Sequence, residues 1–343
     1  MQTVENADIM GKKVADQLVE TICRAGIRHI YAVTGDSLNE VNDAVRRAGT
    51  VRWVHVRHEE SGAFAAAAES ELNGIACCAG SSGPGHVHLI NGLYDAHRSN
   101  CPVLAIASTC PSDQFGTGYF QETDPIRLFD DCSGYNQMAV TPAQFARMLP
   151  AALQHAIHRR EVAVVGLPGD VAASPCAESP GASGPLPSHG IYRPLDGELR
   201  QLAEMIGSAE RITVFCGIGA REAHDEVVRL AAMLKAPVAY TFKAKMEVQY
   251  DNPYEIGMTG LLGLPSAYGA MHESDLLLLL GTDFPYDCFL PSECRIAQVD
   301  IRPERIGRRA RVELGLAGDV KETLQALFPM LRERSDRVFL DRQ

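Results

Sequence analysis

The sequence predicts an α/β protein built from two doubly wound parallel-sheet domains. Short runs of apolar and β-branched residues alternate with helical patterns in both halves of the chain. Apolar strands separated by helices are typical of a parallel sheet covered on both faces. Residues 172–194 are rich in Pro, Ser, Gly and Ala, which indicates a connecting segment. We therefore expect domains at residues 1–180 and 195–343, joined by a linker at 181–194.

The first half alternates helix and strand in order. Val14, Leu18 and Ile22 recur at helical spacing, and Gly26 is placed to end that helix. Strands are predicted at residues 29–33, 51–56, 75–79, 103–108 and 162–167, and further helices at residues 63–72, 83–97 and 145–157. In a parallel sheet, the turns that follow such strands lie at the edge where ligands bind.

The same alternation returns in the second half. Helices are predicted at residues 199–206, 222–234 and 320–331, and strands at residues 212–216, 238–241, 276–280 and 296–299. The tail at residues 332–343 is charged and has no capped ending, as in a chain that continues.

Composition argues against several classes of protein. The formal net charge of −11 argues against general nucleic-acid binding, which needs a basic face. The first residues lack the pattern of a signal peptide, and the longest apolar run, residues 276–280, is too short to span a bilayer. Ten cysteines without a CxxC pair indicate reduced thiols in a cytoplasmic protein, not a disulfide framework or a zinc site.

Glu59 is the first candidate functional residue. It follows a predicted strand and begins an alanine-rich helix, so its carboxylate lies at the carboxyl end of a parallel strand. Open α/β sheets bind ligands at that edge. Taken alone, Glu59 is better explained as an acid that complements the dipole at a helix N-terminus.

Other turns could border a ligand site near Glu59. They are Gly35-Asp36-Ser37, Ser81-Ser82-Gly83-Pro84-Gly85 and the loop that contains Phe120-Gln121-Glu122. Tight turns at strand ends leave backbone N–H groups free to meet a ring or an anion, although each turn is as readily structural. His86 and His88 lie on different faces of a helix, so we expect structural or pocket-wall roles and no metal site in this chain.

Seven motifs together identify a family. They are Val33-Thr34-Gly35-Asp36-Ser37, Arg57-His58-Glu59-Glu60, Ser82-Gly83-Pro84-Gly85, Asn91-Gly92-Leu93-Tyr94-Asp95-Ala96, Pro102-Val103-Leu104-Ala105-Ile106, Phe120-Gln121-Glu122 and Leu167-Pro168-Gly169-Asp170-Val171. In order and spacing they resemble the pyrimidine-binding domain of thiamine-diphosphate enzymes, in the pyruvate oxidase and acetolactate synthase branch. Within that branch the pattern most resembles the bacterial quinone-linked pyruvate dehydrogenases, flavoproteins that oxidise pyruvate to acetate and carbon dioxide.

The resemblance implies roles for the residues of the first domain. Glu59 would hydrogen-bond the ring nitrogen N1′ of the aminopyrimidine and exchange a proton with it. Residues that would contribute to the pyrimidine pocket are Gly35, Asp36, Gly83, Pro84 and Gly85. Residues that would line the substrate end of the site are Phe120 and Gln121.

The second domain resembles the Rossmann-like middle domain that holds FAD in these enzymes. The residues implied to contact FAD are Gly217, Gly219, Gly260, Leu261, Leu262, Gly263, Phe284, Pro285, Tyr286, Asp300, Arg302 and Asp319. Some thiamine-diphosphate enzymes keep this domain without flavin. The glycine-rich loop at residues 257–263 and the run at residues 284–286 favour FAD.

Enzymes of this family carry a third domain that binds the diphosphate through magnesium. Its signature, Gly-Asp-Gly followed by Asn-Asn, does not occur in this sequence. We therefore expect magnesium and the diphosphate group to be held elsewhere, in a homo-oligomer (a dimer or a tetramer) or by a partner chain. The chain is then a fragment, a truncated gene product or a natural subunit whose partner supplies the third domain, and is expected to be inactive alone.

The leading interpretation is oxidative decarboxylation of pyruvate with a quinone acceptor. The resemblance implies a cytoplasmic protein, with the full enzyme peripheral at the inner face of the membrane. One alternative is an acetolactate synthase-like carboligase that uses the same Glu59. Another is a flavin-binding module or pseudoenzyme without thiamine chemistry. A nicotinamide-dependent dehydrogenase fits less well, because the turn at residues 35–37 lacks the GxGxxG spacing.

Overall fold

The computed structural model divides the chain into two compact units, residues 1–188 and 189–343. It describes residues 11–178, 185–186, 188 and 190–343. The predicted linker therefore lies partly outside the described residues.

Unit 1, residues 1–188, alternates strands and helices along the chain. Its strands are β1 (His29–Ala32), β2 (Arg52–His55), β3 (Ala76–Gly80), β4 (Val103–Thr109), β5 (Tyr135–Met138) and β6 (Val162–Pro168). Its helices are α2 (Val14–Arg24), α3 (Asn39–Ala48), α4 (Glu59–Asn73), α5 (Pro84–Ser99), α6 (Pro125–Leu128), α7 (Pro142–Arg159) and α8 (Gly169–Ala173). The strands run parallel in the order β2–β1–β3–β4–β6–β5.

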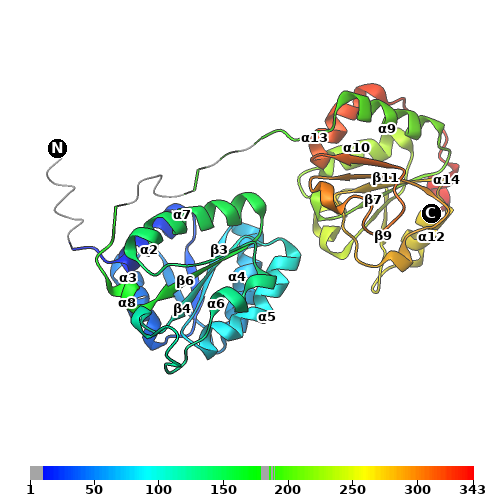
Figure 1. Ribbon diagram of the computed structural model, residues 1–343. Helices are drawn as coiled ribbons and strands as arrows, with labels where there is room; N and C mark the ends of the chain where they lie inside the picture. Colours follow the sequence, from blue (N-terminus) through cyan, green and yellow to red (C-terminus); the bar gives the residue numbers. More distant parts are fainter. Residues whose placement is uncertain (1–10, 179–184, 187, 189) are drawn as a thin grey trace, which may run out of the picture. The chain divides into compact units, whose positions relative to one another are not determined.

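Helices cover both faces of this sheet (Figure 1). Residues of α2, α3 and α7 pack on one face, and residues of α4 and α5 pack on the other. Strands β3, β4 and β6 are buried along their whole length, as is typical of the centre of a parallel sheet. From β1 the chain passes to β2 on one side and then to β3 on the other. The strand order therefore reverses between β1 and β3, where open α/β sheets bind ligands.

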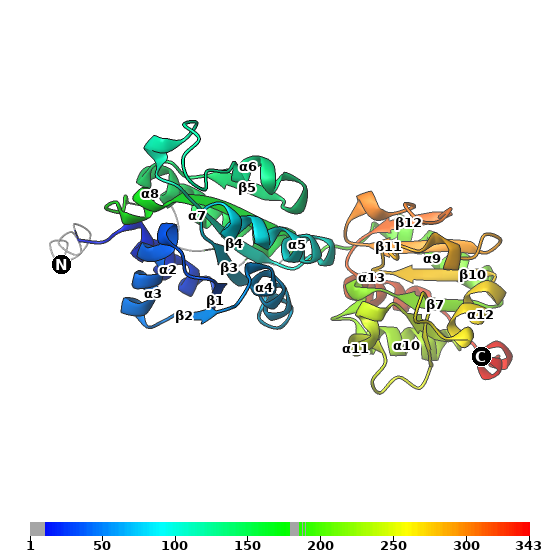
Figure 2. The same ribbon diagram turned by 90° about the horizontal axis from the view of Figure 1, so that it is seen from below.

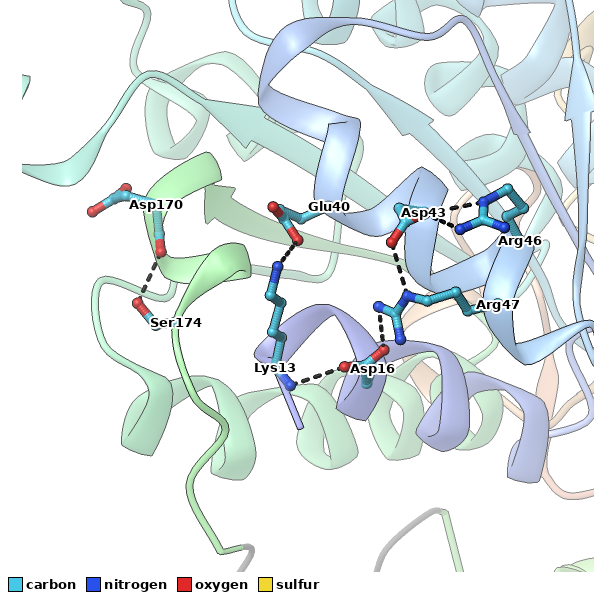
Figure 3. A network of polar contacts seen from close by, with 8 residues as sticks. All are labelled: Lys13, Asp16, Glu40, Asp43, Arg46, Arg47, Asp170 and Ser174. Carbon is cyan, nitrogen blue, oxygen red and sulfur yellow. Dashed lines mark hydrogen bonds and ion pairs between the residues drawn. The ribbon is translucent and has the colours of Figure 1, made fainter. Parts of the chain in front are cut away.

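Ion pairs join α2 and α3 at one end of unit 1. The Lys13 ammonium pairs with Glu40 at 2.7 Å, and the Arg47 guanidinium pairs with Asp16 at 2.7 Å (Figure 3). A hydrogen bond from Arg47 is the main reason that the pKa of the Asp43 carboxyl is lowered. Partly exposed pairs of this kind add little to the free energy of unfolding. They do fix the position of α3, the helix that follows the first strand-end turn.

Unit 2, residues 189–343, repeats the architecture with its own sheet (Figure 2). Its strands are β7 (Ile212–Cys216), β8 (Val238–Tyr240), β9 (Glu255–Met258), β10 (Leu276–Leu280), β11 (Arg295–Asp300) and β12 (Leu314–Ala317). Its helices are α9 (Asp196–Ser208), α10 (His224–Leu234), α11 (Lys245–Val248), α12 (Pro265–Glu273), α13 (Val320–Leu327) and α14 (Val338–Arg342). The parallel strands follow the order β12–β11–β10–β7–β8–β9, so the order reverses between β7 and β10.

The predicted fold class, two doubly wound parallel-sheet domains, is confirmed. Three strands that were not predicted, β5, β9 and β12, lie at sheet edges and are only partly buried. The last predicted helix ends at Leu327 and not at residue 331. A 3₁₀ turn, Phe328–Met330, follows it, because Pro329 lacks the N–H that an α-helix needs.

None of the helices within the described residues combines the length and apolar character needed to cross a bilayer.

Candidate active site

Glu59 is the first residue of α4, at the carboxyl edge of the sheet in unit 1. The side chain of His58 caps this helix, because its Nδ1 accepts the backbone N–H of Glu60 at 3.3 Å. Glu59 is only 7% exposed. Its Oε2 accepts a hydrogen bond of 3.0 Å from His88 Nδ1 on α5. Glu59 is therefore more than an acid that complements the helix dipole, because its carboxylate is buried and is hydrogen-bonded to a side chain of a second helix.

Close packing of α4 on α5 brings His88 to Glu59. A Cβ added at Gly92 of α5 would lie 2.5 Å from Ala63 Cβ and 2.9 Å from the Glu60 carbonyl oxygen. Only glycine at position 92 therefore permits this approach of the two helices. The sequence predicted that His86 and His88 have separate roles, and in the structure their rings have different partners.

His58 and His88 lie beside each other at the entrance to the Glu59 carboxylate. Their rings stack with centroids 4.3 Å apart and an interplanar angle of 24°. Their side chains are 47% and 43% exposed, whereas the side chain of Glu59 is 9% exposed. Sequence reasoning missed this pairing, because the two histidines come from different helices and only the packing of α4 on α5 joins them.

Two glycine turns meet beside Glu59. A Cβ added at Gly35, after β1, would lie 2.5 Å from Ser81 Oγ, after β3. One added at Gly85 would also lie 2.5 Å from Ser81 Oγ, and 3.4 Å from Glu59 Oε1. The backbone N–H of Ser82 donates to Ser37 Oγ at 2.9 Å, which ties the two turns together. The glycines thus let the two turns close on Ser81, and Gly85 brings no Cβ toward Glu59 Oε1.

The loop with Gln121 closes over the second turn. Gly83 has a φ of 63°, and a Cβ added there would lie 2.8 Å from Gln121 Cβ. Gln121 itself has a φ of 60°, an uncommon conformation for a residue with a side chain. Its Oε1 accepts a hydrogen bond from the Ser82 hydroxyl at 3.3 Å. The structure therefore brings Glu59, Gly35, Gly85 and Gln121 together, as the positions of the turns predicted.

The remaining predicted residues of unit 1 are at the margin of this cluster. Asp36 and Pro84 are exposed in their turns. Phe120 is 78% exposed. The Glu122 carboxylate orders the loop by accepting backbone N–H groups of Gly116, Gly118 and Tyr119, and the bond from Gly116 is the main reason that the pKa of Glu122 is lowered.

His86 anchors the loop from inside the protein. Its Nδ1 donates to the carbonyl oxygen of Ser108 at 2.8 Å, and its Nε2 accepts the Thr123 hydroxyl at 2.6 Å. Burial lowers the pKa of His86, which favours the neutral ring whose Nε2 can accept the Thr123 hydroxyl. The role of His86 is therefore structural.

In unit 2, two of the glycines predicted to contact FAD, Gly217 and Gly219, allow two turns to pack closely against each other. A Cβ added at Gly217, after β7, would lie 2.3 Å from the Gly281 carbonyl oxygen, after β10. One added at Gly219 would lie 2.7 Å from Gly281 Cα. These turns flank the reversal of strand order in the second sheet. The packing alone explains why both positions are glycine.

The aromatic and glycine-rich loops of unit 2 differ in exposure. Phe284 is buried and stacks edge-on against Phe215 at 5.4 Å and Tyr286 at 5.6 Å. Pro285 lies between the two aromatic residues. Leu261 and Leu262 are 71% and 72% exposed in the loop bounded by Gly260 and Gly263.

Two acids predicted to contact FAD have different environments. Asp300, at the end of β11, is 3% exposed, and burial raises the pKa of its carboxyl. It accepts the backbone N–H of Arg302 at 2.9 Å. Asp319 instead caps α13 by accepting the N–H of Glu322 at 3.1 Å. Asp319 therefore has a structural explanation, whereas Asp300 is a buried carboxylate at a ligand-binding edge.

Comparisons with known proteins identify the family of both units. Residues 12–128 match the thiamine pyrophosphate enzyme N-terminal TPP binding domain, and residues 199–327 match the thiamine pyrophosphate enzyme central domain. The chain belongs to the thiamine pyrophosphate enzyme family. The first match contains the whole Glu59 cluster, and the second contains the carboxyl edge of the second sheet.

Relatives in this family carry different names. An uncharacterized 42.6 kDa protein of Pseudomonas amyloderamosa is 50% identical over 96% of this chain and 84% of its own length. A pyruvate oxidase of Lactiplantibacillus plantarum is 32% identical over 90% of this chain and 52% of its own length. A chloroplastic acetolactate synthase of Arabidopsis thaliana is 30% identical over 96% and 51% respectively. The chain thus spans about half the length of the two named enzymes.

The Glu59 cluster fits the aminopyrimidine that this enzyme family binds. Glycine at position 85 places no Cβ beside Glu59 Oε1, where an added Cβ would lie 3.4 Å away. A flat ring with a nitrogen at its edge suits a buried carboxylate next to bare backbone. The predicted residues of unit 1 therefore suit the pyrimidine end of thiamine diphosphate.

Replacing Gly85 tests the packing of the turns. Gly85→Ala should lower the free energy of unfolding by about 1–3 kcal/mol, because the new Cβ overlaps Ser81. Gly207→Ala in α9, where a Cβ meets nothing within 4 Å, is the matched control and should stabilise by up to about 1 kcal/mol. Urea unfolding measures both. Equal stability of Gly85→Ala and the unmodified protein would contradict this account.

The buried His86 predicts a pH dependence of stability. Its folded-state pKa is lowered, so between the folded and unfolded pKa values the unfolded chain binds more protons. Stability should therefore fall as the pH drops from about 7.5 through the unfolded value near 6.5, and level off below the folded pKa. Urea unfolding of His86→Gln, whose amide does not titrate, should show a weaker dependence over this window. If the stability of His86→Gln depended on pH as strongly as that of the unmodified protein, His86 would not be the group responsible.

Proposed function

We propose that this chain is part of a thiamine-diphosphate- and FAD-dependent enzyme that oxidatively decarboxylates pyruvate to acetate and carbon dioxide. The observation that carries the proposal is the buried Glu59 carboxylate, held beside bare backbone where the strand order reverses. A quinone is the proposed electron acceptor. We place the protein in the cytoplasm, with the complete enzyme at the inner face of the membrane, where a quinone is within reach.

Glu59 has two carboxylate oxygens with different surroundings. Oε2 accepts the N–H of His88, which fixes the orientation of the carboxylate. Oε1 lies toward Gly85 and can meet the ring nitrogen N1′ of the aminopyrimidine. Glu59 then holds or releases a proton at N1′ while His88 keeps the carboxylate oriented. When bound, thiamine diphosphate supplies the nucleophilic carbon that adds to the keto group of a 2-oxo acid.

Gln121 and Phe120 suit the substrate end of the site. The Gln121 amide oxygen accepts from Ser82, so the amide group lies at the border of the turns around Glu59. Its NH₂ group can donate to the carboxylate of a 2-oxo acid. The exposed ring of Phe120 can exclude water once a substrate or another subunit covers it.

FAD is proposed for unit 2 on the strength of Asp300. A buried carboxylate at the end of a parallel strand suits the ribose hydroxyl groups of a dinucleotide. The residues that hold magnesium and the diphosphate group are proposed to lie outside residues 1–343, in a longer form of this chain that assembles as a homo-oligomer or in a partner chain. A dimer or a tetramer would bring such residues to the Glu59 edge.

A carboligase is the second candidate. Identity to the acetolactate synthase, at 30%, is close to that of the pyruvate oxidase, at 32%, and both enzymes would use Glu59 in the same way. Product analysis of the complete enzyme with pyruvate, thiamine diphosphate, magnesium and a quinone separates the two. We expect acetate with reduction of the quinone. Formation of acetolactate without reduction of the quinone would establish the carboligase. If the protein bound flavin but formed neither product, it would be a flavin-binding module.

Replacing Glu59 tests the proposed chemistry. In the complete enzyme, Glu59→Gln should preserve the fold and lower kcat by about 10²–10⁴-fold, because the amide cannot exchange a proton with N1′. Glu69→Gln is the matched control, since Glu69 is another carboxylate on α4, with a side chain 10% exposed, and pairs with a histidine, His29, at 2.7 Å. Circular dichroism checks the fold. Turnover of Glu59→Gln at the rate of the unmodified enzyme would exclude the assignment.

Replacing Asp300 tests the flavin. Asp300→Asn should weaken FAD binding by at least about tenfold, since a hydrogen bond to a charged group contributes roughly 1.5–3 kcal/mol. Quenching of flavin fluorescence measures the affinity. Asp275→Asn, which alters an acid that precedes β10 at the opposite edge of the sheet, should leave it unchanged. If Asp300→Asn and Asp275→Asn bound FAD with equal affinity, Asp300 would not be part of the flavin site.

A further inference from the structure

His58, Glu59 and His88 form a cluster that the proposed reaction uses only in part. Within the described part of the chain, these three are the group of histidine, cysteine and acidic side chains whose donor atoms converge, all within 4.8 Å of one another. The proposed chemistry gives a role to Glu59 and an orienting role to His88. It gives none to the stacked ring of His58, which brings a second imidazole to the same carboxylate.

The spacing of these donor atoms suits one metal ion. A zinc ion about 2.0–2.1 Å from each ligand atom places neighbouring ligands roughly 3–3.5 Å apart. Glu59 Oε2 and His88 Nδ1 are already 3.0 Å apart. His58 Nδ1 now accepts the N–H of Glu60 at 3.3 Å, a long bond that the exposed ring can give up when it turns toward a cation.

The chemistry of the donors selects a class of metal. Two imidazoles and a carboxylate are the protein ligands of many catalytic zinc sites, and imidazole also suits copper, iron and nickel ions. The half-exposed histidines give a cation access from solvent, and the buried carboxylate supplies negative charge beneath them. Hard ions such as magnesium prefer oxygen ligands and are disfavoured here.

We propose that His58, Glu59 and His88 bind a divalent first-row transition metal ion such as Zn²⁺. The proton on His88 Nδ1, now donated to Glu59, is exchanged through solvent for one on Nε2 as Nδ1 takes the metal, so the ring stays neutral. The metal site needs only the residues of this chain. One consequence rests on the proposed function: a metal ion and an aminopyrimidine both need Glu59 and so exclude each other.

Calorimetric titration of the reduced chain with zinc sulfate tests the site. We expect one zinc ion per chain at this cluster, read from the stoichiometry of the titration. His58→Ala and His88→Ala should each weaken binding at least about tenfold, because loss of hydrogen-bonding partners outside the ligand shell already costs 10–100-fold. Circular dichroism confirms that each variant is folded.

A matched control separates this site from ordinary histidine–carboxylate pairs. His155 pairs with Glu161 at 2.9 Å in the same unit. His155→Ala should leave zinc affinity unchanged. Unchanged affinity in His58→Ala and His88→Ala, or an equal loss in His155→Ala, would overturn the proposal.

Cobalt(II) distinguishes these ligands from thiolates, since Cys288 is exposed and could take up zinc. The absorption spectrum of the cobalt complex should lack the intense thiolate-to-metal band and be lost in His88→Ala. A thiolate band that disappears in Cys288→Ser would show that the metal binds elsewhere and refute the site. Neither result bears on the thiamine proposal, which the products and the Glu59→Gln variant decide separately.

Discussion

The meeting of two glycine turns at the reversal of strand order is the constraint on which the site in unit 1 depends. Gly35 and Gly85 both lie against Ser81, and a side chain at either position would overlap it. Because the turns close in this way, the carboxylate of Glu59 is buried and yet has bare backbone beside one oxygen. The cofactor chemistry proposed for this family member, and the alternative use of Glu59 as a metal ligand, both follow from that placement.

In unit 2, glycine-containing turns also pack closely where the strand order reverses. Gly217 and Gly219 pack on Gly281 so closely that glycine is required whether or not a ligand binds. A glycine motif is therefore weak evidence for a flavin in this fold. The buried carboxylate of Asp300 is stronger evidence, because burial raises the pKa of this acid and the cost of burying it is one that a hydrogen-bonding ligand can offset.

Sequence patterns predicted the central strands, because runs such as residues 276–280 are apolar on both faces, and they predicted the turns that surround Glu59. They missed β5, β9 and β12, because these edge strands have only four residues each and contain polar residues or glycine, which interrupt the apolar pattern. They also missed the contact of His58 and His88 with Glu59. That contact depends on the approach of α4 to α5 at Gly92, a tertiary distance that periodicity does not encode.

The role of Glu59 depends on where the aminopyrimidine binds relative to its carboxylate. A crystal structure of the complete enzyme with thiamine diphosphate would measure the distance from Glu59 Oε1 to N1′. The account predicts a hydrogen bond of about 2.6–3.2 Å, with the ring against the backbone at Gly85. A ring bound elsewhere, with Glu59 still bonded only to His88, would contradict it.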